Sequence, residues 1–91
     1  MSKAALIVGA GDATGGAIAK AFAREGYVAC VNRRARNADQ LEALAQSIRD
    51  EGYKAHAYPA DARIEDDVVA MVDAIERDVG PIEVAVFNIG A

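Results

Sequence analysis

A run of small residues between an apolar segment and an amphipathic one is the feature that most restricts the fold of this chain. Residues 4–8 are apolar without alternation, and residues 9–16 then read GAGDATGG. A continuous apolar run suits a strand buried on both faces of a parallel sheet, and glycines let the backbone turn sharply after it. Residues 17–25 carry apolar side chains at helical spacing, and Gly26 follows as the stop. The sequence therefore predicts a strand, a tight glycine turn and a helix.

Strand and helix patterns alternate along the rest of the chain. Apolar runs at residues 27–31, 53–58 and 82–87 predict three more strands. Two amphipathic segments, one ending at Gly52 and one beginning near Arg63, predict the helices between those strands. The expected buried faces comprise Leu41, Leu44, Ala45 and Ile48 in the first of these helices and Val68, Val72, Ile75 and Val79 in the second.

The starts of these two helices carry their own signals. Asn37 stands three residues before Gln40, which resembles a capping box with asparagine in place of serine or threonine. Three acidic residues, Glu65, Asp66 and Asp67, fall in the first turn of the later helix, where they complement the helix dipole. Both patterns predict where a helix begins.

The resulting order, βαβαβαβ, predicts an α/β fold of the Rossmann type. Right-handed crossovers place the strands in one parallel sheet with helices on both faces. If the second crossover extends the sheet outward, the strand order is 3-2-1-4, and the order reverses between strands 1 and 4. Ligands of such sheets bind there, at the carboxyl ends of the strands. We expect residues 1–91 to form the N-terminal portion of such a domain, a partial sheet in which strand 4 is an apolar edge.

The composition and charge of the chain argue against several classes of function. The chain has 53% hydrophobic residues and a formal net charge of -4, which is typical of a globular protein and argues against nucleic-acid or anionic membrane partners. The single cysteine, Cys30, lies in an apolar run without metal-ligand neighbours, so a buried and inert thiol is expected. The N-terminal apolar run is too short to span a membrane and lacks a signal-peptide pattern. We expect a cytoplasmic protein without a metal site.

The glycine turn itself predicts a bound phosphate group. Glycines between a strand and a helix let the backbone approach a pyrophosphate, which then faces the N–H groups at the helix start. In the dehydrogenase fingerprint G-x-G-x-x-G, Gly9 and Gly11 fit, but the third glycine comes one residue late, at Gly15. A P-loop is excluded because no Gly-Lys-Ser/Thr follows.

The spacing resembles that of the short-chain dehydrogenase/reductase family. The turn of that family reads T-G-x-x-x-G-x-G, and residues 8–15 lie over it. Gly9 and Gly15 match, while Val8 replaces the threonine and Ala13 replaces the middle glycine. The resemblance implies a nicotinamide dinucleotide cofactor. The turn residues expected at its phosphates are Gly9, Gly11, Asp12, Ala13, Thr14 and Gly15.

The end of strand 2 addresses the choice of cofactor. An NAD-selective site carries a carboxylate about 20 residues beyond the first glycine. This chain has Asn32 there, followed by Arg33 and Arg34. A neutral amide followed by guanidinium groups favours a 2′-phosphate, which arginine binds bidentately. By resemblance, Arg33 holds the place of the arginine in NADP-preferring members. NADP is therefore expected over NAD, and the alternative is a solvated basic loop.

Two further segments extend the resemblance. Asp61, with Ala62 beside it, looks like the family's aspartate that binds the adenine amino group; a helix N-cap is the alternative role, and the two are compatible. Residues 87–90 resemble the family's N-N-A-G segment, in which Asn88 and Gly90 match. In the family this segment lies along the nicotinamide-side ribose. The four motifs occur in the family's order over all 91 residues.

The residues that perform hydride transfer in the family have no match here. The family uses a serine and a Tyr-x-x-x-Lys pair, which belong to parts of the domain beyond strand 4. No catalytic residue is therefore expected within this chain. His56, the single histidine, is expected at the surface or in packing. Four positions after Tyr27, Tyr53 and Tyr58 stand Val31, Ala57 and Ala62, so the pair is absent.

The resemblance thus implies the NADP(H)-binding portion of an oxidoreductase that transfers hydride between the cofactor and an alcohol or carbonyl substrate. We expect a homo-oligomer or pairing through the edge of strand 4. One alternative is a stand-alone nucleotide-binding module without catalysis. Another is a flavodoxin-like domain that binds FMN or another phosphate.

Overall fold

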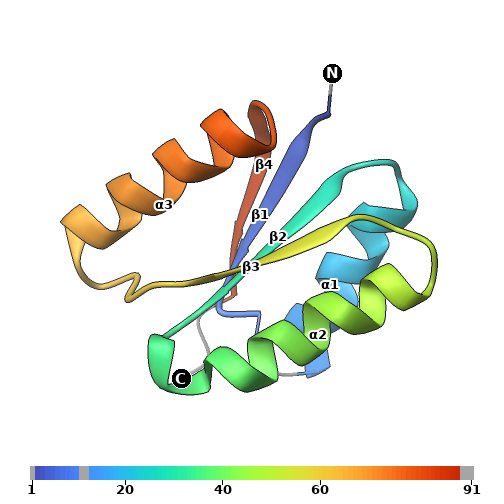
Figure 1. The fold of residues 1–91 in the computed structure, drawn as a ribbon, viewed down its shortest axis with the longest axis horizontal. Coiled ribbons are helices and arrows are strands. Elements are labelled where there is room, and N and C mark those ends of the chain that lie inside the picture. Colours follow the sequence, from blue (N-terminus) through green and yellow to red (C-terminus); the bar gives the residue numbers. More distant parts are fainter. Residues whose placement is uncertain (1, 11–12, 89–91) are drawn as a thin grey trace.

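The fold was analysed in a computed structural model that describes residues 2–10 and 13–88. Strands and helices alternate along the chain, with a short 3-10 helix, η1, inserted before the second α-helix (Figure 1). The elements are β1 (Ala4–Val8), α1 (Ala13–Arg24), β2 (Val28–Arg33), η1 (Ala35–Asn37), α2 (Ala38–Asp50), β3 (Ala55–Pro59), α3 (Glu65–Asp78) and β4 (Ile82–Phe87).

The strands form one parallel sheet in the order β3-β2-β1-β4. Helices α1 and α2 cover one face of this sheet and α3 covers the other (Figure 1). The expected Rossmann-type fold, order and reversal between strands 1 and 4 are therefore confirmed. A flavodoxin-like sheet, in which strand 1 neighbours strand 3, is excluded.

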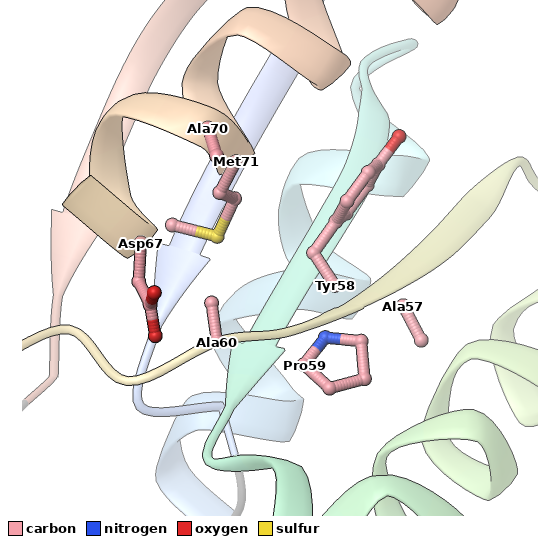
Figure 2. Close-up of a pocket in the computed structure, with 7 residues that line it drawn as sticks. All are labelled: Ala57, Tyr58, Pro59, Ala60, Asp67, Ala70 and Met71. Carbon is pink, nitrogen blue, oxygen red and sulfur yellow. The ribbon is translucent and has the colours of Figure 1, made fainter.

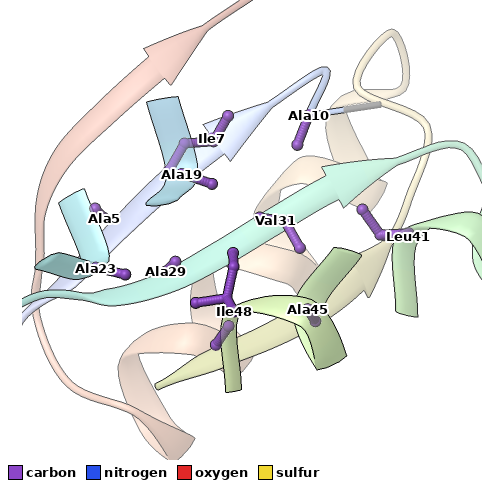
Figure 3. Close-up of a cluster of buried hydrophobic side chains, with 11 residues drawn as sticks. Ala5, Ile7, Ala10, Ala19, Ala23, Ala29, Val31, Leu41, Ala45 and Ile48 are labelled. Carbon is purple, nitrogen blue, oxygen red and sulfur yellow. The ribbon is translucent and has the colours of Figure 1, made fainter. Parts of the chain in front are cut away.

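Strand β1 is the centre of the core because both of its faces are covered. Ala5 and Ile7 pack in the cluster beneath α1 and α2 (Figure 3). Leu6 and Val8 point the other way, into the cluster formed with Met71 and Ile75 of α3. The continuous apolar run at residues 4–8 reflects this burial from both sides.

Strand β4 is half-covered. Its residues alternate between partly buried and exposed, and Val84 and Val86 pack on the α1 and α2 side. Phe87, on the opposite face, is 64% exposed as a residue. The expected apolar edge is confirmed, and on the α3 side only Ile82, at the start of the described strand, packs against the core.

Two element boundaries differ from those expected at the site. Helix α1 begins at Ala13 and not at residue 17, so part of the glycine run lies in its first turn. Strand β2 ends at Arg33 and not at residue 31, because Asn32 and Arg33 continue the ladder opposite Tyr58 and Pro59. Polar and glycine residues suggested loops in both places, and tertiary packing overrode these local preferences.

The predicted capping box is wrong, because its two hydrogen bonds are not formed. Asn37 does precede α2, but its side chain makes no capping hydrogen bond. The side-chain oxygen of Gln40 accepts a hydrogen bond from Arg33 Nη1 at 2.8 Å instead of reaching back to the helix start. The buried face of α2 is as expected. The buried residues of α3 are Met71 and Ile75, and Met71 was not part of the apolar face predicted from the sequence.

Candidate functional site

The glycine turn after β1 is held by its neighbours on both sides. Gly9 has φ of 78°, which favours glycine, and a Cβ there would lie 2.1 Å from the carbonyl oxygen of Asn88. The backbone N–H of Asn88 donates to Val8 O at 2.9 Å, and its side-chain Nδ2 donates to Gly9 O at 3.2 Å. The end of β4 is therefore fixed against the glycine turn, at the point where the strand order reverses.

The start of α1 packs directly on the same turn. A Cβ on Gly15 would lie 2.7 Å from Ala10 Cα and 2.8 Å from Gly9 O, so only glycine allows the helix to come this close. Ala13 and Thr14 are exposed in the first helical turn. The dipole of α1 favours an anion in front of this turn. Gly11 and Asp12 were also expected at the phosphates, and they lie outside the described residues.

Asn32 is a structural junction at the carboxyl end of β2. Its residue surface is only 1% exposed, and its Nδ2 donates to Tyr58 O at 2.9 Å and to Ala60 O at 3.2 Å. Its own carbonyl oxygen accepts from the N–H groups of Gly9 at 3.1 Å and Ala10 at 3.0 Å. Asn32 lies within β2 and not beyond a strand that ends at residue 31, and its amide group joins β2 to the exit of β3.

Arg33 and Arg34 follow this junction at the carboxyl edge of the sheet. Arg33 is half-buried, and its guanidinium is held by the hydrogen bond to Gln40 of α2. Arg34 is exposed immediately before η1. The alternative of a wholly solvated basic loop does not describe Arg33, which belongs to β2 and has a partner on a helix.

Asp61 lies in the segment between β3 and α3, and its carboxylate is engaged. Its Oδ1 accepts from the backbone N–H of Arg63 at 2.9 Å and from Arg63 Nε at 3.0 Å, while Oδ2 accepts from Arg63 Nη2 at 2.9 Å. These bonds hold the pKa of Asp61 well below its usual range, and the nearby Arg34 adds to the effect. Ala62, beside it, is exposed.

The alternative role of Asp61 as the helix N-cap is wrong. Helix α3 begins at Glu65, and the residue before it is Ile64, which makes no side-chain cap bond. The backbone N–H of Asp61 instead donates to Asp67 Oδ2 at 3.3 Å, and Asp61 O accepts from the N–H of Ile64 at 3.0 Å. Both bonds tie the segment to the start of α3.

A shallow cavity lies near this segment but away from the glycine turn. It is formed between β3 and α3, with Tyr58 and Pro59 on one side and Met71 on the other (Figure 2). Its carboxylate, Asp67, is the one that receives the N–H of Asp61. The residues that line this hollow belong to β3, α3 and the segment between them, and none comes from the glycine turn.

Several groups are removed from consideration as reactive centres. Cys30 is buried as expected, and burial raises the pKa of its thiol to about 12. His56 is exposed on β3. Among residues 2–10 and 13–88, no group of acidic, histidine or cysteine side chains could hold a metal ion. Within the same residues, no helix has the length and apolar character needed to cross a membrane.

The sheet order thus brings four expected segments together at the carboxyl ends of the strands: the glycine turn, the end of β2, the segment after β3 and the end of β4. Gly90 lies outside the described residues. Sequence reasoning missed Gln40, Arg63 and Asp67 as partners of these segments. An aspartate that bonds the backbone two residues on is a recurring turn signal, and it would have pointed to the pair of Asp61 with Arg63.

Comparison with known proteins gives a consistent result. The family model described as short chain dehydrogenase matches residues 3–91. Gluconate 5-dehydrogenase of Gluconobacter oxydans is 38% identical over 86 residues, which are 94% of this chain and 33% of that protein. The chain therefore spans about a third of the length of the curated relatives that it matches.

Two solved structures are similar to the whole described fold. A short-chain dehydrogenase from Rhodopseudomonas palustris has a TM-score of 0.85 and 40% identity, covering 99% of this chain and 41% of that one. An actinorhodin polyketide ketoreductase variant, solved with NADPH, has a TM-score of 0.89 and 30% identity over 99% of this chain and 34% of the other. Together with the glycine turn and the sheet order, these matches show that the chain belongs to the short-chain dehydrogenase family.

Proposed function

We propose that this chain forms the NADP(H)-binding portion of an oxidoreductase that transfers hydride between the cofactor and an alcohol or carbonyl substrate. The observation that carries the proposal is the position of Arg33 and Arg34. Arg33 ends β2 and Arg34 follows it at the carboxyl ends of the strands, next to the strand that leads into the glycine turn. No carboxylate stands at the end of β2, where one would repel a 2′-phosphate.

In this proposal, each segment at the carboxyl ends of the strands binds one part of the cofactor. The turn from Gly9 to Gly15 and the start of α1 face the pyrophosphate, because backbone N–H groups and the helix dipole favour an anion there. Arg33 and Arg34 bind the 2′-phosphate. The adenine lies against Asp61 and Ala62. The nicotinamide-side ribose lies along Asn88 and Gly90.

Hydride chemistry would come from the bound nicotinamide, and this chain would bind and orient it. The serine and the Tyr-x-x-x-Lys pair would be supplied by sequence other than these residues, as the missing match among Tyr27, Tyr53 and Tyr58 indicates. In this proposal, residues 1–91 are the N-terminal portion of a Rossmann domain.

Isothermal titration of the purified protein with NADP and with NAD tests the proposal. We expect tighter binding of NADP, and we expect Arg33→Asp to reverse the preference by removing a phosphate ligand and adding a carboxylate. An unchanged ratio in that variant would remove Arg33 from the site. Binding of neither nucleotide by folded protein would refute the proposed function.

Two expectations stay predictions of the sequence. One is a homo-oligomer or pairing through the exposed edge of β4, which light scattering of the purified protein would detect. The other is a cytoplasmic location, which cell fractionation would test. The substrate class is tested by NADPH oxidation with aldehydes and ketones.

A further inference from the structure

Arg63 forms the most complete side-chain ion pair at the carboxyl edge of the sheet, among the described residues. The three hydrogen bonds from its backbone N–H, Nε and Nη2 occupy both oxygens of Asp61. The Arg63 side chain is 69% exposed and that of Asp61 is 21% exposed. The contact therefore lies at the surface of the site, where side chains remain within reach of a ligand.

Asp61 poses an electrostatic problem for a site that receives a 2′-phosphate. The phosphate carries about -1.5 to -2 charges near neutral pH, so a carboxylate close by repels it. The backbone N–H of Ala60 donates to Arg33 O at 2.9 Å, which brings the segment of Asp61 beside Arg34, and Arg34 helps to lower the pKa of Asp61. Without another partner, this carboxylate would compete with the phosphate for the Arg34 guanidinium.

We propose that Arg63 is a specificity-determining residue, which neutralises Asp61 and so leaves Arg34 available for the 2′-phosphate of NADP. This inference rests on the proposed function, because it concerns the same cofactor. Arg63 acts through Asp61 and is a positioning residue with respect to the phosphate. The carboxylate can still accept from the adenine amino group, since each oxygen of a carboxylate has more than one lone-pair site.

The ligands 2′,5′-ADP and 5′-AMP isolate the effect, because they differ only by the 2′-phosphate. In Arg63→Gln we expect about fivefold weaker binding of 2′,5′-ADP at low salt, as one exposed charge interaction permits. Binding of 5′-AMP should change less than about twofold. Added salt should reduce the difference, because screening weakens exposed charge interactions.

A second substitution separates neutralisation from direct contact. In the double variant Asp61→Asn with Arg63→Gln, the carboxylate charge is gone while an acceptor oxygen for adenine remains. We expect 2′,5′-ADP affinity to return to within about twofold of the wild type. Arg63→Lys keeps the positive charge and should retain most of the preference.

Arg77 supplies a matched control at the opposite end of α3. Its Nε and Nη2 bind the two oxygens of Asp78 at 3.0 and 3.2 Å, so Arg77→Gln removes a similar exposed pair. This control should leave both affinities unchanged.

Isothermal titration measures the affinities, and circular dichroism checks that every variant is folded. Equal losses for 2′,5′-ADP and 5′-AMP in Arg63→Gln, or no loss, would overturn the inference, as would a double variant as weak as the single one. Failure of the wild type to bind 2′,5′-ADP would refute the proposed function itself.

Discussion

Replacing Asn32 by aspartate exchanges one NH2 group for an oxygen inside the sheet. The substitution keeps the shape of the side chain, so it changes the hydrogen bonds and the charge and little else. In the wild type, Nδ2 donates to Tyr58 O at 2.9 Å and to Ala60 O at 3.2 Å. In the variant, both carbonyl oxygens face an acceptor that has no hydrogen to donate.

The cost follows from these two contacts. Leaving a buried polar group without its partner costs about 1–3 kcal/mol, so two carbonyls give about 2–6 kcal/mol at neutral pH. Small domains have a total stability of only about 5–15 kcal/mol. We therefore expect the Asn32→Asp variant to lose a large fraction of its free energy of unfolding.

The loss should depend on pH. Burial beside two carbonyl oxygens raises the pKa of the introduced carboxyl above its value in the unfolded chain. The protonated carboxyl can donate one hydrogen bond, so stability relative to the wild type is best below the unfolded pKa, about 4, and falls as pH rises through the folded pKa.

Urea unfolding followed by circular dichroism at pH 7 and at pH 4 measures both effects. Asn37→Asp is the matched control, because it makes the same chemical change at a residue whose side chain makes no capping bond. That control should stay within about 0.5 kcal/mol of the wild type. If Asn32→Asp were as stable as Asn37→Asp at pH 7, the two hydrogen bonds would not hold the junction as argued.

Two further predictions concern backbone geometry and a thiol. Gly9→Ala should destabilise the fold severely and abolish nucleotide binding, because its Cβ would lie 2.1 Å from Asn88 O at a φ of 78°. Gly26 has a φ of 99° and open space around it, so Gly26→Ala should cost only the backbone strain of about 1–2 kcal/mol. Thermal unfolding compares the two, and equal losses would contradict the role given to the close approach. Cys30 should not react with a thiol reagent at pH 8 until the protein unfolds, because burial raises its pKa to about 12; rapid labelling of native protein would contradict this.

Much of the fold could be predicted from local patterns. The apolar run at residues 4–8, the alternation of strand and helix signals and the glycine turn gave the correct order of elements and the correct sheet. Element ends were less predictable. Gly15 is a poor helix former, yet it lies in α1 because the helix packs too closely on Ala10 for any other residue.

The candidate site was also predictable only in part from the sequence. The residue types at the ends of β1, β2 and β4 could be read from spacing and from the family resemblance. The partners of Asn32 could not, because Tyr58 and Ala60 are far along the chain and meet it only through the register of parallel strands. The bond between Arg33 and Gln40 likewise depends on how α2 packs.

The sequence alone determined the alternation of elements, the need for glycine after β1 and the basic character of the segment that follows β2. These depend on side-chain size, periodicity and charge, which each short segment carries by itself. Only the tertiary structure decided that Asn32 is a buried junction and that Arg33 is hydrogen-bonded to Gln40 of α2. Those contacts depend on strand register and helix packing, because hydrogen bonds require partners within about 3 Å.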